Sequence, residues 1–510
     1  MTSSSFVNPT YYNLQRAVIR SEYSNIGELD ITALIPRLSI SVSIDSETIF
    51  GTARIVDSVG LLDGNDSRDP LRGEEQIILE IADSKSINEN GGTESGEIEN
   101  PFRFVGFVYK VDNIETKEVN DAVMYDIHFI SYQSFKAGTY EIIRAFIDER
   151  VSDIAKTIFD DYYQKSSDLS EIKDPRDRKR LFVEDTDGVY RCTIPKMRPE
   201  EAMVFLTKRS YSTRSPSCMF RFFENTRGYH YVTDEQLYRL ATDDTETDYD
   251  PARLFEFTYL DAIPNTLDFF DQQLNNLESI ENSKRVNSLD DIYNGAYRNK
   301  VYEIDILSKN LNLLDDKNQY DYFDRRNDYL NPGKFKKISD RHTSSFINTV
   351  HRGSEDVQKQ WLVVQNYTIG EKTGENAMQA ETYYADIIAN RAAYSKHVEN
   401  ITVNARGPGR LDITAGDIVD LAVKDFVFAD SAEAGDFETN KHLSGKYIVR
   451  SVTHSMEYEE MFNSYVLIKR EWSQIGADQE AVSDAIVGRT PIGFGVSSSS
   501  AALPFSLGDE

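Results

Sequence analysis

Residues 444–472 read SGKYIVRSVTHSMEYEEMFNSYVLIKREW, two apolar runs on either side of an acidic turn. The runs KYIVRSVTH (446–454) and SYVLIKREW (464–472) are rich in β-branched and aromatic residues, as strands are. The composition of this stretch predicts two of the strands that complete a β domain. His454 stands where the first run meets the turn, with hydroxyl side chains on both sides.

The neighbourhood of His454 raises the question of nucleophilic catalysis. A catalytic serine needs a base that a third group orients, and adjacency of Ser and His in the sequence supplies none of that geometry. No GxSxG turn occurs in the chain. We therefore interpret His454 as a structural histidine at the end of a strand.

The same two-residue period appears near the N-terminus. In RLSISVSID (37–45) apolar residues alternate with serine, which gives a strand one apolar and one polar face. Further runs of this kind are TIFGTARIVD (48–57), QIILEIADS (76–84), FRFVGFVYKVD (102–112) and AVMYDIHFISY (122–132). So many strands within about 110 residues predict a small antiparallel barrel or sandwich.

The middle of the chain changes to helical spacing. Ile147, Val151, Ile154 and Ile158 recur as one face of a helix over 142–163. Pro199 opens a second helix, RPEEAMVFLTKRSY, whose apolar side carries Ala202, Met203, Phe205 and Leu206. Two aromatic strands follow, CMFRFFEN and YHYVTDEQL, joined by TRG. These elements predict an α+β domain.

Strand character returns at LFEFTYL (254–260), VYEIDIL (301–307) and LDITAGDIVDLAV (411–423), and a helix is expected over 376–398. The predicted organisation is an N-terminal arm (1–29), a first β domain (30–140), an α+β domain (141–250), a second β domain (251–308 with 377–472), a polar insertion (309–376) and a flexible tail (473–510). Candidate partner-docking residues in the tail are Phe494, Leu503, Phe505 and Leu507, although an idle terminus is the alternative.

Composition excludes several classes of protein. Lys and Arg total 56 against 85 Asp and Glu, a net charge of −29, which argues against binding to phosphate backbones. Cys192 and Cys218 form no CxxC pair, so neither a disulfide framework nor a structural zinc site is expected. The N-terminus lacks the pattern of a secretory signal, and no apolar run approaches the ~20 residues that span a bilayer. We expect a soluble protein made in a reducing compartment.

Metal and cofactor motifs are also weak. Asp63, Asn65, Ser67, Asp69 and Glu74 have the spacing of a calcium loop, but Arg68 replaces its glycine and strands flank it, so a polar hairpin connector is the alternative. The histidines besides His454 are scattered, without HExxH, at positions 128, 230, 342, 351, 397 and 442. His128 alternates with core-like residues, which places it on the polar face of its strand. No phosphate-binding glycine motif follows a strand, so we predict no catalytic, cofactor or metal site.

Three stretches carry a resemblance to a known family. The first is RPEEAMVFLTKRSY (198–211) followed by CMFRFFENTRGYHYVTDEQL (218–237), and the second is GAYRNKVYEIDILSKN (295–310). The third is DITAGDIVDLAV (412–423) with GKYIVRSVTHSMEYEEMFNSYVLIKRE (445–471). Together they resemble the baseplate hub proteins of contractile-tailed, T-even-like bacteriophages and of related injection machines.

The resemblance implies a mainly β fold, with two similar antiparallel β-barrel domains of the tube type and an intervening α+β domain. It further implies a homotrimer that joins the six-fold tail tube to a three-fold spike, around a channel through which viral DNA passes without specific binding. The implied partners are a separate spike protein, tail tube or tube-initiator proteins and the tape measure protein. Such a protein has no membrane span and no enzymatic activity, and it is found in the virion tail baseplate after assembly in the host cytoplasm.

Two other functions stay open at this point. A virion-associated glycan hydrolase would need a cleft with two carboxylates of opposed pKa, and carboxylate pairs are too common in this acidic chain to identify one. A sugar-binding adhesin would need exposed tryptophans, and only Trp361 and Trp472 are present.

Overall fold

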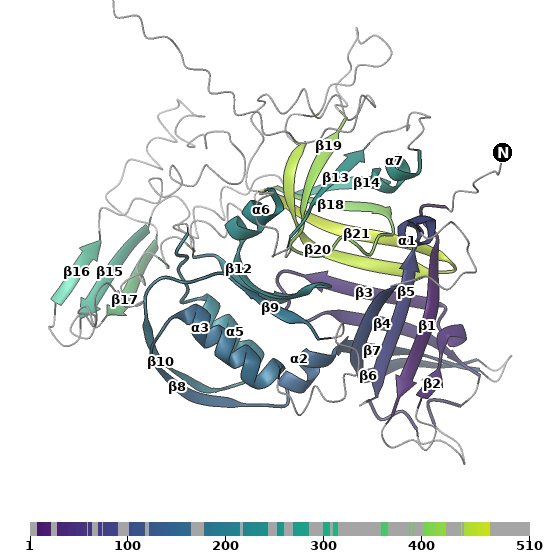
Figure 1. The fold of residues 1–510 in the computed structure, drawn as a ribbon, viewed down its shortest axis with the longest axis horizontal. Helices are drawn as coiled ribbons and strands as arrows, with labels where there is room; N and C mark the ends of the chain where they lie inside the picture. The colour runs from purple at the N-terminus through teal and green to yellow at the C-terminus, as the bar shows by residue number, and fades with distance from the viewer. Residues whose placement is uncertain are drawn as a thin grey trace, which may run out of the picture.

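A computed structural model gives the structure of this protein. It describes residues 8–21, 28–58, 60–63, 70–73, 75–89, 101–117, 122–164, 178–214, 218–242, 252–259, 269–284, 299–305, 310–314, 359–365, 387, 391, 401–424, 440 and 443–469. Its strands gather into one 13-stranded sheet, one 2-stranded sheet and two 3-stranded sheets. Figure 1 shows the strands of the N-terminal part and of the C-terminal part side by side, with the α+β elements packed beside them.

The N-terminal strands form the first β unit. They are β1 (Tyr12–Arg20), β2 (Glu28–Asp30), β3 (Arg37–Ser43), β4 (Phe50–Asp57), β5 (Gln76–Asp83), β6 (Phe102–Lys117) and β7 (Ala122–Ser131), with the short helices η1 (Thr32–Leu34) and α1 (Ser84–Glu89). Along β3 the apolar Leu38, Ile40 and Val42 are buried and the serines between them are not, as the alternation predicts. Residues 12–20, expected in the N-terminal arm, form a strand that pairs with β5.

The middle of the chain forms the α+β part. Its elements are α2 (Tyr132–Ala137), β8 (Ile142–Glu149), α3 (Val151–Ile158), the π-helical turn η2 (Phe159–Tyr163), β9 (Arg180–Val183), β10 (Tyr190–Met197), α5 (Pro199–Thr207), β11 (Phe220–Glu224), β12 (Gly228–Thr233) and α6 (Asp234–Thr242). The helix predicted from Pro199 is confirmed, and its Ala202, Met203 and Leu206 are buried.

Two expectations in this part are wrong. Residues 142–149 form strand β8 instead of the first half of a helix, because they pair with β10, and Ile142 and Phe146 are buried in the core of the α+β part while Ile147 is 68% exposed. The second aromatic strand ends at Thr233, whose Oγ1 accepts a hydrogen bond from the backbone N–H of Gln236 at 3.2 Å. This N-cap starts helix α6 inside the predicted strand.

The C-terminal strands form the second β unit. They are β13 (Leu254–Tyr259), β14 (Ser279–Lys284), β18 (Ile401–Pro408), β19 (Ile418–Val423), β20 (Gly445–Glu457) and β21 (Glu460–Lys469), with helix α7 (Phe269–Asn275). The strand expected over 411–423 begins only at Ile418, because the carboxylate of Asp417 accepts the Thr414 N–H at 2.8 Å and holds the preceding residues in a turn. Strand β18 was not expected. Of the helix expected over 376–398 only Ile387 and Arg391 are described, and both are helical.

A separate sheet is built from β15 (Asn299–Asp305), β16 (Asn310–Leu314) and β17 (Lys359–Gln365). Strand β15 was expected in the second β domain, yet it pairs with β16 and β17 from the predicted insertion. The domain boundaries as such stay predictions, and the tail at 473–510 lies outside the described residues.

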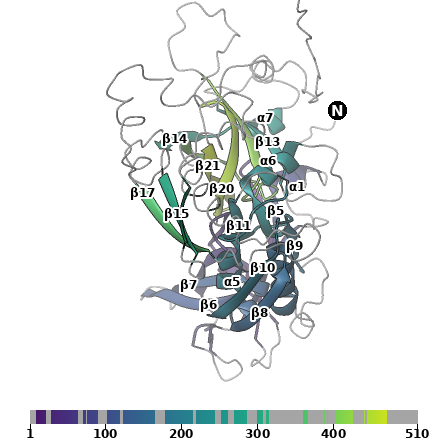
Figure 2. The same cartoon turned by 90° about the vertical axis from the view of Figure 1, so that its left-hand side faces the viewer.

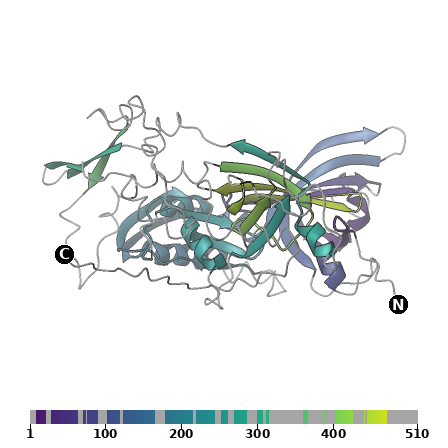
Figure 3. The ribbon, with the colours of Figure 1, turned by 90° about the horizontal axis from the view of Figure 1, so that it is seen from above.

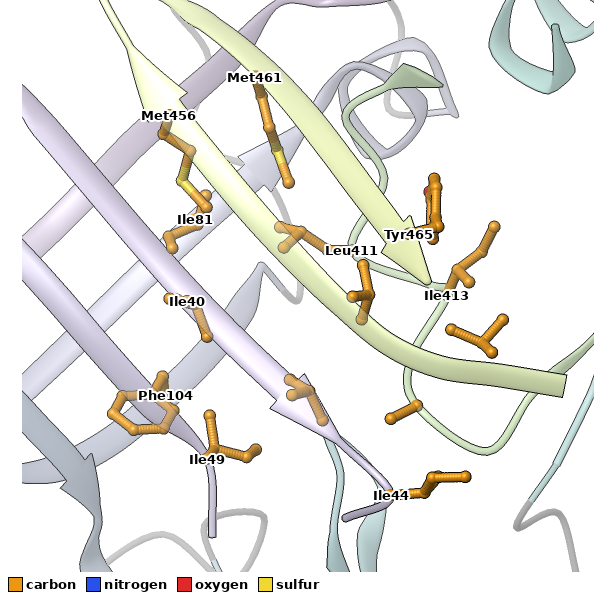
Figure 4. Close-up of a cluster of buried hydrophobic side chains, with 14 of the residues drawn as sticks. Ile40, Ile44, Ile49, Ile81, Phe104, Leu411, Ile413, Met456, Met461 and Tyr465 are labelled. Carbon is orange, nitrogen blue, oxygen red and sulfur yellow. The ribbon is translucent and has the colours of Figure 1, made fainter. Parts of the chain in front are cut away.

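One apolar core runs through both β units. Ile40 and Ile81 of the first unit belong to the same buried cluster as Leu411 and Met456 of the second, as Figure 4 shows. The α+β part has a core of its own around α3, α5 and the hairpin of β11 and β12. No helix in the described part of the chain is long and apolar enough to cross a membrane.

Candidate functional site: the seam between the two β units

The two β units have the same strand order. Neighbouring strands of the first follow the order β1, β5, β6, β7, β4, β3, and those of the second follow β13, β19, β20, β21, β18, β14. Numbered along the chain, with the short β2 and the separate β15–β17 sheet left aside, both orders read first, fourth, fifth, sixth, third, second. One pair differs, since β13 and β19 are parallel where β1 and β5 are antiparallel. The two units are therefore repeats of one topology, and in the sequence one precedes and the other follows the α+β part.

A bulge occurs at the same place in both repeats. In β6 the register shifts between Val108 and Lys110, and in β20 it shifts between Val449 and Ser451. A bulge bends its strand and leaves one residue outside the ladder. This shared irregularity aligns the two fifth strands residue by residue.

The residues just before the bulge also correspond. The N–H of Val108 donates to the carbonyl of Glu75 at 2.9 Å, and the N–H of Val449 donates to the carbonyl of Asp417 at 2.8 Å. The carboxylate of each acid then accepts a backbone N–H of its own loop. Glu75 accepts from Gly73 at 2.9 Å, and Asp417 accepts from Thr414 at 2.8 Å. These two acids were not among the predicted site residues, although a glycine followed by an acid precedes each strand, in RGEE and AGDI.

Strand β20 changes partner at its bulge, and this joins the two units. Residues 445–448 pair with β19 of the same unit, whereas residues 451–457 pair with β3 of the first unit. The hydroxyls of Ser41 and Thr453 lie 3.0 Å apart across this seam, and the N–H of Ile44 donates to the carbonyl of Arg450 at 2.9 Å. The seam is thus a continuous antiparallel ladder between repeats.

His454 lies in the middle of the seam, opposite Ile40. The expected strand end is wrong, because β20 continues to Glu457 and turns at Tyr458 and Glu459, which both have positive φ as a type I′ hairpin turn requires. The ring is fully buried and its Nδ1 lies 2.9 Å from Oδ1 of Asn463. Burial lowers the pKa of His454 below its ordinary value, since the interior disfavours the imidazolium.

Acid is expected to weaken the seam through His454. The unfolded chain takes up a proton at this residue as the pH falls through about 6.5, while the folded chain, whose His454 pKa is lowered, does not. The contribution of the neutral His454 to stability is therefore fully present above that pH and is lost progressively below it. The free energy of unfolding, measured by urea denaturation, should fall more between about pH 7.5 and about pH 5.5 in the native protein than in His454→Gln, whose side chain takes up no proton in this range. Equal losses would show that His454 does not contribute.

The hairpin of β11 and β12 holds the seam from the α+β side. Glu224, at the end of β11, is fully buried and accepts hydrogen bonds from Thr48 Oγ1 and the Ile49 N–H, both at 3.2 Å. The Nζ of Lys179 donates to the same carboxylate at 2.7 Å. Through Glu224 the hairpin is bonded to the first unit.

The turn of the same hairpin is bonded to the second unit. The guanidinium of Arg227 donates two hydrogen bonds to Asp417, each 2.7 Å long. Next to it, Nδ2 of Asn225 donates to the carbonyl of Ala415 at 3.0 Å. Bidentate pairs of this kind fix orientation as well as distance.

A third contact lies directly over the seam. Asp45 accepts hydrogen bonds from Arg221 of β11 and from Arg450, the bulged residue of β20, both at 2.6 Å. Arg221 also donates to the buried Asp234 at 2.7 Å. The hairpin therefore fixes the angle between the repeats, and we call these contacts the hairpin clamp.

The other candidate residues lie away from this seam or outside the described residues. His128 is on the polar face of β7, with Nδ1 3.1 Å from Thr52 Oγ1 and Nε2 2.8 Å from Asp112 Oδ1. His230 is fully buried between the rings of Phe182 and Phe223, and burial lowers its pKa. Of the proposed calcium ligands only Asp63 is described, and the tail residues Phe494, Leu503, Phe505 and Leu507 are not. The described residues contain no metal-binding cluster of His, Cys, Asp and Glu.

Comparison with family models and with curated proteins finds no match. Among solved structures, the tail protein from Neisseria meningitidis MC58 is similar over 91% of this chain and 98% of its own, at 8% identity and a TM-score of 0.47. The 43 kDa tail protein of prophage MuSo2 from Shewanella oneidensis is similar over 91% of this chain and 100% of its own, at 8% identity and a TM-score of 0.44. The c3393 protein of E. coli, a component of the type VI secretion system, is similar over 91% of this chain and 79% of its own, at 8% identity and a TM-score of 0.39. The first two of these are described as tail proteins and the third as a component of a type VI secretion system.

Proposed function

We propose that this chain is a structural hub of a phage tail baseplate, a homotrimer that joins a six-fold tail tube to a three-fold spike. The observation that supports the proposal is the duplicated β unit. Three chains carry six repeats of one topology, so their repeats match a six-fold ring while the chains themselves match a three-fold one. Such an adaptor works through broad interfaces and needs no catalytic residue.

The proposal assigns partners to each end of the trimer. A separate spike protein occupies the three-fold end, and tail tube or tube-initiator proteins, with the tape measure protein, occupy the six-fold end. Viral DNA passes through the central channel into the host without specific binding, which a net charge of −29 favours because like charges repel the phosphate backbone. The protein is assembled in the host cytoplasm and functions in the virion tail.

Multi-angle light scattering on the purified full chain tests this function. The expected mass is about three times 58.2 kDa, at micromolar concentration and physiological salt. A mass of one chain would contradict the proposal. Incubation with cell-wall preparations should release no soluble sugar, and release would favour the glycan hydrolase.

A further inference from the structure

We propose that strand β14 of one copy pairs with the second half of β6 of the next copy. This contact repeats between chains what β3 and β20 do within one chain. The inference rests on the proposed function, because it supplies the joint that a ring of copies requires. It follows from the equivalence of the two repeats, in which β14 corresponds to β3 and β6 corresponds to β20.

The first of the two surfaces is the second half of β6. Strand β6 pairs with β5 only over residues 102–107, up to its bulge, and in the described residues no strand pairs with the same edge beyond Val108. In β20 the equivalent edge, residues 451–457, is the one that β3 occupies. Residues 110–117 of β6 pair with β7 on their other side, and Figures 2 and 3 show the β6 and β7 strands projecting together from the rest of the molecule.

The second surface is the outer edge of β14. Within the described part of the chain β14 pairs only with β18, so it ends the large sheet. Its equivalent β3 is bonded on both sides, by β4 and by β20. An open strand edge presents unpaired N–H and C=O groups that accept a further strand. The described residues therefore contain one open edge of each kind that the seam within the chain uses.

The register between copies follows from rows of paired residues across the sheets. Each row begins at the residue that follows the bulge and passes from one strand to its paired residue on the next. In the first unit the row is Lys110, His128, Thr52, Ser39. In the second unit it is Ser451, Val466, Asn404, Glu281. Ser39 and Glu281 are thus equivalent.

The partner of Ser39 across the seam is Ser455, which pairs with Phe462 of β21 as Glu115 pairs with Met124 of β7. Glu281 should therefore lie opposite Glu115 of the next copy, and the same reasoning places Lys284 opposite Asp112. The like charges at the first pair are offset, because Glu115 already forms an ion pair with Arg54 at 3.1 Å.

The two edges differ, and this decides the kind of assembly. Because a β14 edge meets a β6 edge, each added copy leaves one edge of each kind open, and only a closed ring leaves none. Such head-to-tail contacts make rings when the rotation closes. Exposure of Tyr109 (44%) and Ile114 (56%) on β6 fits a surface that a second copy covers.

Cysteine cross-linking of the full chain tests the contact. Opposite residues of antiparallel strands have Cα atoms about 4.5–5.5 Å apart, within reach of a disulfide. On mild oxidation the Glu115→Cys, Glu281→Cys double variant should shift from the one-chain band to multi-chain bands on a non-reducing gel. Each single variant should stay at one chain, as should Ile147→Cys with Glu281→Cys, since Ile147 is exposed on β8, outside both edges.

A second pair, Asp112→Cys with Lys284→Cys, keeps the test decisive if the first variant fails to fold, because both pairs belong to one register. Linkage of either pair above the Ile147 control supports the contact. Trimer mass without linkage of a folded variant overturns the contact alone and leaves the hub standing. One-chain mass without linkage overturns both.

Discussion

Replacing Arg227 with alanine is expected to lower the free energy of unfolding by about 3–5 kcal/mol. The substitution removes both 2.7 Å hydrogen bonds from Asp417, which is fully buried where the β11–β12 hairpin meets the second β unit. Asp417 would keep its charge in the interior without its cation. Urea denaturation followed by far-UV circular dichroism measures the change.

Arg37→Ala is the matched control for this variant. Arg37 also lies at the seam, but its side chain is 67% exposed and 3.8 Å from Glu457, so its loss should cost no more than about 1 kcal/mol. Equal midpoints for the two variants would contradict the clamp. Burial already raises the pKa of Asp417, and loss of Arg227 should raise it further. The deficit of Arg227→Ala relative to the native chain should therefore shrink as the pH is lowered.

The second large effect concerns one pair of core positions in the repeats. Gly51 faces Phe129 in the first unit, and the equivalent pair in the second unit is Val403 and Leu467. A Cβ added at Gly51 would lie 2.0 Å from the Phe129 ring, so Gly51→Val should destabilise the chain by about 1–3 kcal/mol or more. Combining it with Phe129→Leu copies the pair of the second repeat and should restore part of that loss.

A double-mutant cycle on urea midpoints measures this rescue. A favourable coupling of about 0.5–3 kcal/mol is expected for residues in direct contact. Additive losses in Gly51→Val, Phe129→Leu and the double variant would mean that the two positions are not interchangeable between repeats. The equivalence of the units would then be in topology alone.

The strands with strict alternation were predictable from the sequence. Leu38, Ile40 and Val42 define the buried face of β3 without any tertiary information. The β8 error has a physical cause, because Ile147 and Val151 are spaced four apart as in a helix, while pairing with β10 decides the backbone. Strand β18 was missed because ITVNARGP is short and ends in glycine and proline.

The seam and its clamp could not be predicted, because their partners are distant in the chain. Arg227 and Asp417 are 190 residues apart, and no local pattern links them. The repeat is also hidden in the sequence, since equivalent positions carry different residues. Tyr109 and Arg450 occupy the same bulge, and Gly51 with Phe129 fills a space that Val403 and Leu467 fill in the second unit. Volume and backbone geometry are kept where residue identity is not.

Single-particle electron microscopy of the purified full chain shows whether the repeated β units of three copies form one ring. The expected particle is a closed three-fold ring in which six β units of similar shape lie at one distance from a central opening. Particles in which the two β units of a chain lie at different distances from the axis, or in which no ring forms, would contradict it.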